Sequence, residues 1–265
     1  MLLFIVALFV LLTVILLIFV NKQRRPHVKD IWVINLDKDA ARMKSVRVQT
    51  SHIADIVHRW PATHGTTCKR EAIHEEGVGY AMTRTGDQKE DARGALRNAG
   101  VVGCWLSHKR LLTHLASLDV PDSHGHLIVE DDVQFPAGFL KPGDAWHGIY
   151  HRIPTNWDMV YLGLTQPVGK PIGDGILRAR TARRGEGNWG THAYLVRHGA
   201  LRAKILPWLA HMVDAIDEQY NLKFDEWNVY VVEPALIGLN DVHSKNSSVL
   251  KMNVNADDSA QISYL

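Results

Sequence analysis

Cysteine is scarce in this sequence: Cys68 and Cys104 are the only two in 265 residues, and they form no C-x-x-C pair. At the level of motifs this excludes a disulfide framework and a thiolate zinc site, and it leaves the redox compartment open. The 15 histidines are scattered and contain no H-E-x-x-H pair, so the zinc-protease motif is absent as well. The formal net charge is only +2 with histidine neutral, so no strong field predicts a nucleic-acid partner.

Charge is missing from the N-terminal segment. Residues 2–20 contain one polar side chain, Thr13, and no charged one. As a helix they would extend for about 28 Å, close to the ~30 Å hydrocarbon core of a bilayer. A cleaved signal peptide would have a basic beginning, a shorter apolar core and small residues at its cleavage site. We therefore expect a retained transmembrane anchor at residues 1–21, followed by a basic stalk at 22–30.

The stalk sets the expected orientation. Its basic side chains are Lys22, Arg24, Arg25 and Lys29, and no charged side chain precedes the apolar segment. The positive-inside rule then predicts a single-pass membrane protein whose folded domain faces the cytosol. The tripeptide Asn246-Ser247-Ser248 would be a glycosylation site only if the domain were lumenal.

About 235 residues follow the apolar segment, enough for one large domain or two small ones. Short apolar runs bounded by turn residues predict buried strands at 31–35, 56–60, 127–129, 157–163, 191–196 and 229–232. Apolar residues at helical spacing predict helices within 37–56, from Gly103 to Leu118 and at 199–209. This pattern indicates a three-layer α/β domain over residues 31–250, with a mostly parallel sheet and a mixed edge, and a C-terminal tail at 251–265. The polar stretch 63–99 is expected to be an irregular excursion over the active face, and residues 165–188 a connection rich in glycine and arginine.

Three carboxylates directly follow one of the predicted strands, in the sequence HLIVEDDVQF. Adjacent like charges repel one another and are costly to desolvate. Glu130, Asp131 and Asp132 therefore form either a solvated acidic turn or a site for a hard divalent cation such as Mg²⁺ or Mn²⁺. Ligands of such sheets bind at the carboxyl ends of strands, which favours the cation site. Along an extended strand, Glu130 and Asp132 would face the same way.

Several further segments resemble glycosyltransferase family 25, which includes bacterial lipopolysaccharide galactosyltransferases and the collagen galactosyltransferases. In chain order they read VINLDKDAARM, RWPATHG, GCWLSH, LIVEDDV, DMVYLG, GTHAYLVRHGA, AIDEQY and YVVEPAL. Together they cover nearly all of the chain from residue 31 to about residue 245. The succession of GCWLSH and LIVEDDV is the most specific part of the resemblance.

The resemblance implies a GT-A-like (Rossmann-like) fold and a metal-dependent, inverting transfer of a sugar, galactose or glucose, from a UDP-sugar to a glycan or glycoprotein acceptor. It implies that Asp132, together with Glu130 or Asp131, holds Mn²⁺ (or Mg²⁺) and the diphosphate, with His243 as a further metal ligand. Asp217 would be the general base, with Asp214 and Asp225 as rivals. The residues that it places around the donor are Asn35, Arg42, Ala62, Gly65, Ser107, His108 and Thr191.

Each of these residues also has a purely structural interpretation. His108 lies on the apolar stripe of its helix, where a histidine is commonly a satisfied core residue. Arg42 could be a solvated helix charge, and Cys104 a small buried thiol that only packs. The arginines of one loop could close over a diphosphate or simply be solvated: Arg178, Arg180, Arg183 and Arg184.

Two other functions stay open at the level of sequence. A metal-dependent phosphohydrolase could use the same carboxylates with His108 and His243, although two-metal sites draw ligands from several strand ends. A non-catalytic sugar-binding module of transferase descent would keep the fold without the chemistry. The identity of the sugar, the linkage and the acceptor are not encoded in recognisable motifs, since single hydroxyl contacts decide them.

Overall fold

A computed structural model of the chain describes residues 2–23, 25–79, 99–240 and 242. Its centre is an eight-stranded sheet in the order β2-β1-β3-β8-β5-β9-β7-β6. The strands of this sheet are β1 (Val28–Asn35), β2 (Val57–Pro61), β3 (Gly125–Glu130), β5 (Met159–Thr165), β6 (Gly169–Gly173), β7 (Ile176–Ala179), β8 (Trp189–Arg197) and β9 (Val229–Val232). A separate pair is formed by β4 (Val133–Gln134) and β10 (Gly238–Leu239).

The direction of the strands makes the sheet mixed. β1, β2, β3, β5, β6 and β9 run one way, and β7 and β8 run the other way. The expected α/β class is therefore confirmed, and its antiparallel members lie inside the sheet as well as near its edge. Because β8 is inserted between β3 and β5, its first residues lie beside the carboxyl ends of these two strands.

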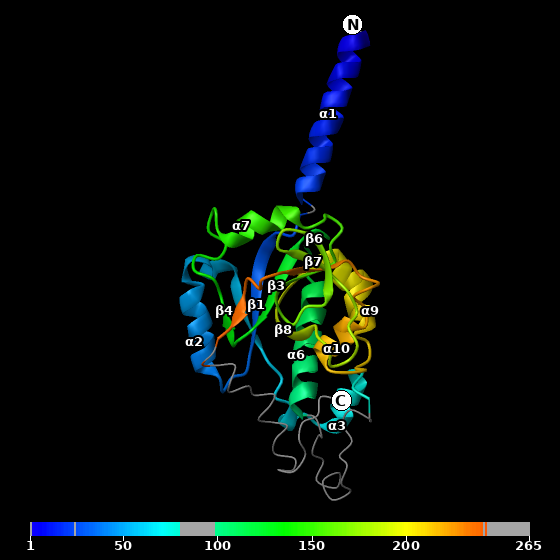
Figure 1. The fold of residues 1–265 in the computed structure, drawn as a ribbon. Helices are drawn as coiled ribbons and strands as arrows, with labels where there is room; N and C mark the ends of the chain where they lie inside the picture. The colour runs from blue at the N-terminus through cyan, green and yellow to red at the C-terminus, as the bar shows by residue number, and fades with distance from the viewer. Residues whose placement is uncertain (1, 24, 80–98, 241, 243–265) are drawn as a thin grey trace, which may run out of the picture.

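Helices cover both faces of this sheet, which gives the expected three layers (Figure 1). The helices are α1 (Leu2–Gln23), α2 (Ala40–Gln49), α3 (Arg70–Glu75), α6 (Ala99–Ala116), α7 (Ala145–Ile149), α8 (His198–Ala200), α9 (Leu206–Trp208) and α10 (Ile216–Asn221). One hydrophobic cluster joins α2 and α7 to one face, and another joins α6, α9 and α10 to the opposite face.

The alternation of side chains along each strand explains the two clusters. Leu127 and Val129 of β3 belong to the cluster beneath α2, whereas Ile128 between them belongs to the cluster beneath α6. Successive side chains of a strand point to opposite faces of a sheet, so a continuous apolar run is buried on both sides. On α6, Leu111, Leu112 and other apolar residues at helical spacing face the sheet and are fully buried.

Several local predictions require correction. Helix α6 begins at Ala99, so Gly103 lies within the helix and does not open it. The stretch 165–188, in which no strand was predicted, contains the hairpin of β6 and β7. Within 63–79, a short 3₁₀ turn (Gly65–Thr67) and α3 are present, whereas residues 80–98 and the predicted tail 251–265 lie outside the described residues.

The predicted membrane anchor is the largest correction. Residues of the apolar segment do form helix α1, but among the residues that the structure describes no helix combines the length and apolarity needed to cross a bilayer. The prediction of a transmembrane helix at 1–21 is therefore wrong.

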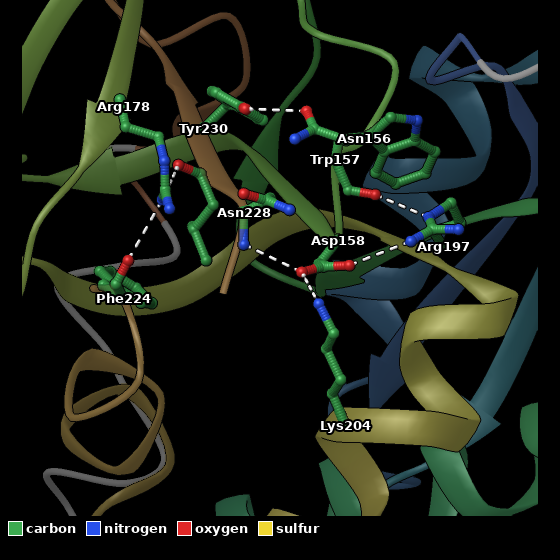
Figure 2. A network of polar contacts seen from close by, with 10 residues as sticks. Asn156, Trp157, Asp158, Arg178, Arg197, Lys204, Phe224, Asn228 and Tyr230 are labelled. Carbon is green, nitrogen blue, oxygen red and sulfur yellow. Dashed lines mark hydrogen bonds and ion pairs between the residues drawn. The ribbon is translucent and has the colours of Figure 1, made fainter. Parts of the chain in front are cut away.

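A buried polar network stabilises the sheet at the end where strands β5 and β9 begin. Asp158 is fully buried, and its carboxylate accepts hydrogen bonds from Arg197 Nη2 at 3.0 Å, Lys204 Nζ at 2.6 Å and the backbone N–H of Asn228 at 2.9 Å. Figure 2 shows the two cations reaching Asp158 from different sides. This network lies at the end of the sheet opposite to the carboxyl ends of β1 and β3.

Candidate active site

A cleft opens at the carboxyl ends of β1 and β3. It encloses about 540 Å³, including its open mouth. The cleft is lined by Ile34, Leu36, Asp39, Arg42, Ala62, Thr63, Gly100, Cys104, Ser107, His108, Glu130, Asp131 and Asp132. Most of the donor-site residues expected from the sequence therefore meet in one place, between α2 and the first half of α6.

The three adjacent carboxylates point to different partners. Strand β3 ends at Glu130, and Asp131 and Asp132 follow in a turn, so the alternation expected along an extended strand does not continue to Asp132. Glu130 Oε1 accepts a hydrogen bond from Thr191 Oγ1 at 2.8 Å and lies 3.7 Å from His108 Nε2.

Asp131 is fully engaged by its neighbours on the α2 side. Its two oxygens accept hydrogen bonds from Asn35 Nδ2 at 2.7 Å and from Arg42 Nη1 at 3.0 Å. Arg59 Nε donates in turn to Asn35 Oδ1 at 2.8 Å, which fixes the orientation of that amide. Arg42 is therefore a nearly buried partner of the acidic turn, and its interpretation as a solvated helix charge is wrong.

Asp132 is the least compensated of the three carboxylates. Its Oδ2 lies 3.8 Å from Arg42 Nη1, and its Oδ1 is buried without a hydrogen-bond partner. Burial, followed by the charges of Glu130 and Asp131, raises the pKa of Asp132 to about 7. An orphaned buried carboxylate oxygen is costly unless a cation reaches it, so this atom is a strong candidate for a metal ligand.

The pKa of Glu130, the last residue of β3, shifts in the opposite direction. Burial acts to raise its pKa, but the nearby His108 and Thr191 outweigh burial, and the pKa of Glu130 is lowered. Glu130 is therefore ionised at neutral pH. Burial also raises the pKa of Asp131, despite its bonds to Asn35 and Arg42.

His108 is fully buried and bridges the cleft to the core. Its Nδ1 lies 2.8 Å from the hydroxyl of Tyr194, while its Nε2 faces Glu130 and has no hydrogen-bond partner. The imidazole is thus a core residue on one side and part of the cleft on the other. Cys104, His108 and Glu130 also bring three ligand atoms within 4.8 Å of one another. Burial and nearby carboxylates raise the pKa of the Cys104 thiol, which disfavours the thiolate that a metal would need.

Ser107 and Gly65 position the wall of the cleft. Ser107 Oγ accepts a hydrogen bond from the Thr63 backbone N–H at 2.8 Å and donates to the Gly103 carbonyl at 2.6 Å. A Cβ at Gly65 would lie 1.6 Å from the Ala99 carbonyl oxygen, so only glycine permits this approach. Ala62 lines the cleft, and its N–H donates to the carbonyl of Asn35 at 3.0 Å, whereas Gly65 packs behind the wall.

Asp217 lies beside the same site, on the side of β8. It stands in the first turn of α10, and its oxygens accept hydrogen bonds from the backbone N–H groups of Gly190 at 2.9 Å and Glu218 at 3.0 Å. Gly190 directly precedes Thr191, which holds Glu130. The charge of Asp217 is also among the causes that raise the pKa of Cys104. Asp217 is therefore held near the cleft by the start of β8.

Its two rivals are engaged elsewhere. Asp214 pairs with Arg184 at 2.9 Å, and Asp225 pairs with Arg180 at 3.1 Å on an exposed surface. Arg178 Nη1 donates to the carbonyls of Phe224 and Val229, both at 3.2 Å. Figure 2 includes Arg178 and its contact with Phe224. Arg178 is half-buried, whereas Arg180, Arg183 and Arg184 are exposed, and none of the four lines the cleft.

Sequence reasoning missed two residues of the site, and one prediction cannot be placed. Arg59 orients Asn35 because β2 pairs in parallel with β1 and brings the two side chains together. A predicted pairing of these two strands could have identified Arg59. Tyr194, which holds His108, lies in the predicted strand 191–196 but carried no motif of its own. His243 lies outside the described residues.

Comparison with known proteins adds no relative. No protein-family model matches the chain, and no curated protein matches it.

Proposed function

We propose that this protein is a metal-dependent glycosyltransferase, which moves galactose or glucose from a UDP-sugar to a hydroxyl group of a glycan or glycoprotein. The observation that carries the proposal is the buried, unpartnered Oδ1 of Asp132, in the turn that follows β3 and beside the charges of Glu130 and Asp131. An acidic strand end that opens into a cleft suits a divalent cation and the diphosphate of a nucleotide sugar.

The residues present fit a hard cation. Asp132 and Glu130 would hold Mn²⁺ or Mg²⁺, because Asp131 is already bound by Asn35 and Arg42. When bound, the cation would neutralise negative charge on the leaving nucleoside diphosphate. Asp131 then has a positioning role: it holds Arg42 beside Asp132, where the guanidinium faces the same cleft.

The acceptor side of the reaction needs a base. In an inverting transfer, the acceptor oxygen forms a bond to C1 while the bond from C1 to the phosphate oxygen breaks, and the hydroxyl proton passes to a carboxylate. Asp217 is the carboxylate that we assign to this step, because Gly190 holds it beside Thr191 and Glu130. Asp214 and Asp225 are committed to ion pairs with arginines.

The experiment separates donor binding from turnover. Thermal shifts of the full chain are measured with UDP-galactose, UDP-glucose, UDP-N-acetyl sugars and GDP-sugars, each with and without Mn²⁺. A ligand that binds only the folded state raises the melting temperature by mass action. We expect a Mn²⁺-dependent rise with one UDP-sugar, and we expect its loss in Asp132→Asn.

Two further variants test the assignment of the base. Asp217→Asn should keep the Mn²⁺-dependent donor shift but lose at least about 100-fold in the release of UDP, since general base catalysis contributes 10²–10⁴-fold. Asp225→Asn, a matched change in an exposed ion pair, should alter neither readout. A folded protein that shows no shift with any donor would sink the proposal. UDP-sugar cleavage to free sugar, with equal rates with and without acceptors, would favour a hydrolase.

A further inference from the structure

A second cluster of metal-ligating side chains lies at the opposite end of the sheet from the cleft. Asp30 near the start of β1 pairs in register with His126 near the start of β3. His124 precedes β3 by one residue, and His198 follows the end of the antiparallel β8. One carboxylate and three imidazoles, from three neighbouring strands and their adjoining residues, therefore lie at the same end of the sheet.

Two imidazoles converge on one carboxylate. His124 Nε2 lies 2.9 Å from Asp30 Oδ2, and His126 Nδ1 lies 3.0 Å from both oxygens of Asp30. These ligand atoms all lie within 4.8 Å of one another. Neither imidazole is a free surface group, because His126 is fully buried and His124 is largely covered.

The distances suit a small cation. Metal bonds of 2.0–2.1 Å in a tetrahedral zinc site place neighbouring ligand atoms roughly 3.3–3.4 Å apart. The imidazole–carboxylate separations of 2.9–3.0 Å therefore need to widen by only a few tenths of an ångström, and the two imidazole nitrogens already lie within 4.8 Å of each other. Two imidazole nitrogens and one carboxylate form a ligand set that zinc accepts, with a fourth position left for water or another ligand. The partial exposure of Asp30 and His124 gives an ion a path from solvent.

A supporting contact fixes the buried imidazole. His126 Nε2 lies 3.1 Å from His198 Nδ1, so the nitrogen of His126 that faces away from Asp30 is engaged by a second, fully buried histidine. Such a bond to the distal ring nitrogen holds a metal-binding histidine in the required tautomer. The backbone N–H of His198 also donates to the His124 carbonyl at 2.8 Å, which joins the supporting residue to the second ligand.

We propose that Asp30, His124 and His126 form a zinc site, supported by His198, that is separate from the carboxylate cleft. The sequence signal is the H-x-H spacing in SHGHL, at the beginning of a strand. Because alternate residues of an extended chain share a face, this spacing presents both imidazoles to one ion. The site staples the beginnings of β1 and β3 together.

The test measures zinc affinity and metal environment in the full chain. The protein is stripped with EDTA and titrated with Zn²⁺ in competition with a chromogenic chelator, and its Co²⁺ spectrum is recorded. The titration of wild-type protein should show one Zn²⁺ bound at this site. His124→Gln and Asp30→Asn should each weaken binding at least about 10-fold, and His198→Asn should weaken it about 10–100-fold. Bound Co²⁺ should show visible absorption without a thiolate charge-transfer band.

Controls separate this site from other possibilities. His147→Gln removes a different histidine–carboxylate pair, with Asp144 at 2.6 Å, and should leave zinc affinity unchanged. Cys104→Ser should also leave it unchanged, because that thiol belongs to the cleft. Equal affinity in wild type, His124→Gln and Asp30→Asn would overturn the proposal. So would His124→Gln lowering the melting temperature by the same amount with and without Zn²⁺, since a hydrogen-bonded cluster alone would explain that.

Discussion

Asp132 concentrates the electrostatic cost of the cleft in one side chain. Its carboxylate is buried beside Glu130 and Asp131, and the pKa is raised to about 7, compared with ~3.9 in an unfolded chain. The native state therefore binds the proton more tightly than the unfolded state. The stabilising contribution of this group is complete below about pH 4 and is lost as the pH rises through about 7.

Asp132→Asn should remove this loss of stability. In metal-free buffer, the variant should match wild type near pH 4 and become more stable than wild type as the pH rises to 8, by on the order of 1–4 kcal/mol. Urea denaturation at several pH values measures the difference. A constant difference across that range would show that Asp132 is not a protonated, uncompensated carboxyl in the native protein.

The sequence predicted a site at the three adjacent carboxylates, but it could not predict which of them would be bound by neighbouring side chains and which would be left without a partner. Three carboxylates after an apolar strand predict a site at a strand end. The commitment of Asp131 to Asn35 and Arg42 depends on the approach of β1 and α2 to β3, about 90 residues apart in the chain. The same approach leaves Asp132 without a hydrogen-bond partner at Oδ1, so the least compensated carboxylate can be identified only from the tertiary structure.

Helix α6 approaches the wall of the cleft so closely that two glycines are required. A Cβ at Gly103 would lie 2.7 Å from the Thr63 carbonyl oxygen and 2.8 Å from the Gly65 nitrogen, both backbone atoms that cannot rotate away. Gly103→Ala should therefore destabilise the protein by about 1–3 kcal/mol, despite the better helix propensity of alanine.

Gly148 in helix α7 provides the control for that substitution. No atom lies within 4 Å of the Cβ that Gly148→Ala would add. This variant should be neutral or slightly stabilising, because alanine favours a helix by up to about 1 kcal/mol over glycine. Denaturant midpoints of the two variants give the comparison. Equal midpoints would mean that the backbone around Thr63 moves to accommodate the added methyl group, so that the close approach of α6 does not determine the position of Thr63.

The sequence predicted elements well where their hydrophobic pattern was long and regular. The buried strands β1, β5, β8 and β9 and most of α6 follow directly from such runs. It failed where the pattern was short or polar: β6, GKPIG, is almost entirely exposed, and β7 has four residues. β7 is a strand because it pairs with the distant β9, and such long-range pairing leaves little trace in a local window, whereas β6 pairs with β7 as the edge of the sheet.

The two ends of the sheet differ in how completely their polar groups are satisfied. At the cleft, Asp132 Oδ1 and His108 Nε2 are buried without hydrogen-bond partners. At the opposite end, the carboxylate of Asp158 accepts three hydrogen bonds, whereas the adjacent histidine cluster leaves one buried atom, His198 Nε2, without a partner. Unsatisfied groups are tolerated where a ligand can complete them, and they need stable structure elsewhere to offset their cost. We therefore expect the end with Asp158 to supply much of the stability that the cleft lacks.

Asp158→Ala tests this division of roles. The substitution removes the acceptor that Arg197, Lys204 and the Asn228 N–H share. It should therefore lower the free energy of unfolding by about 2–4 kcal/mol. Asp225→Ala removes an exposed partner of Arg180 and should cost no more than about 1 kcal/mol. At temperatures where Asp158→Ala is folded, its affinity for a UDP-sugar with Mn²⁺ should stay within about 3-fold of wild type, because the cleft lies at the other end of the sheet. A loss of donor affinity as large as that of Asp132→Asn would show instead that the two ends are conformationally coupled.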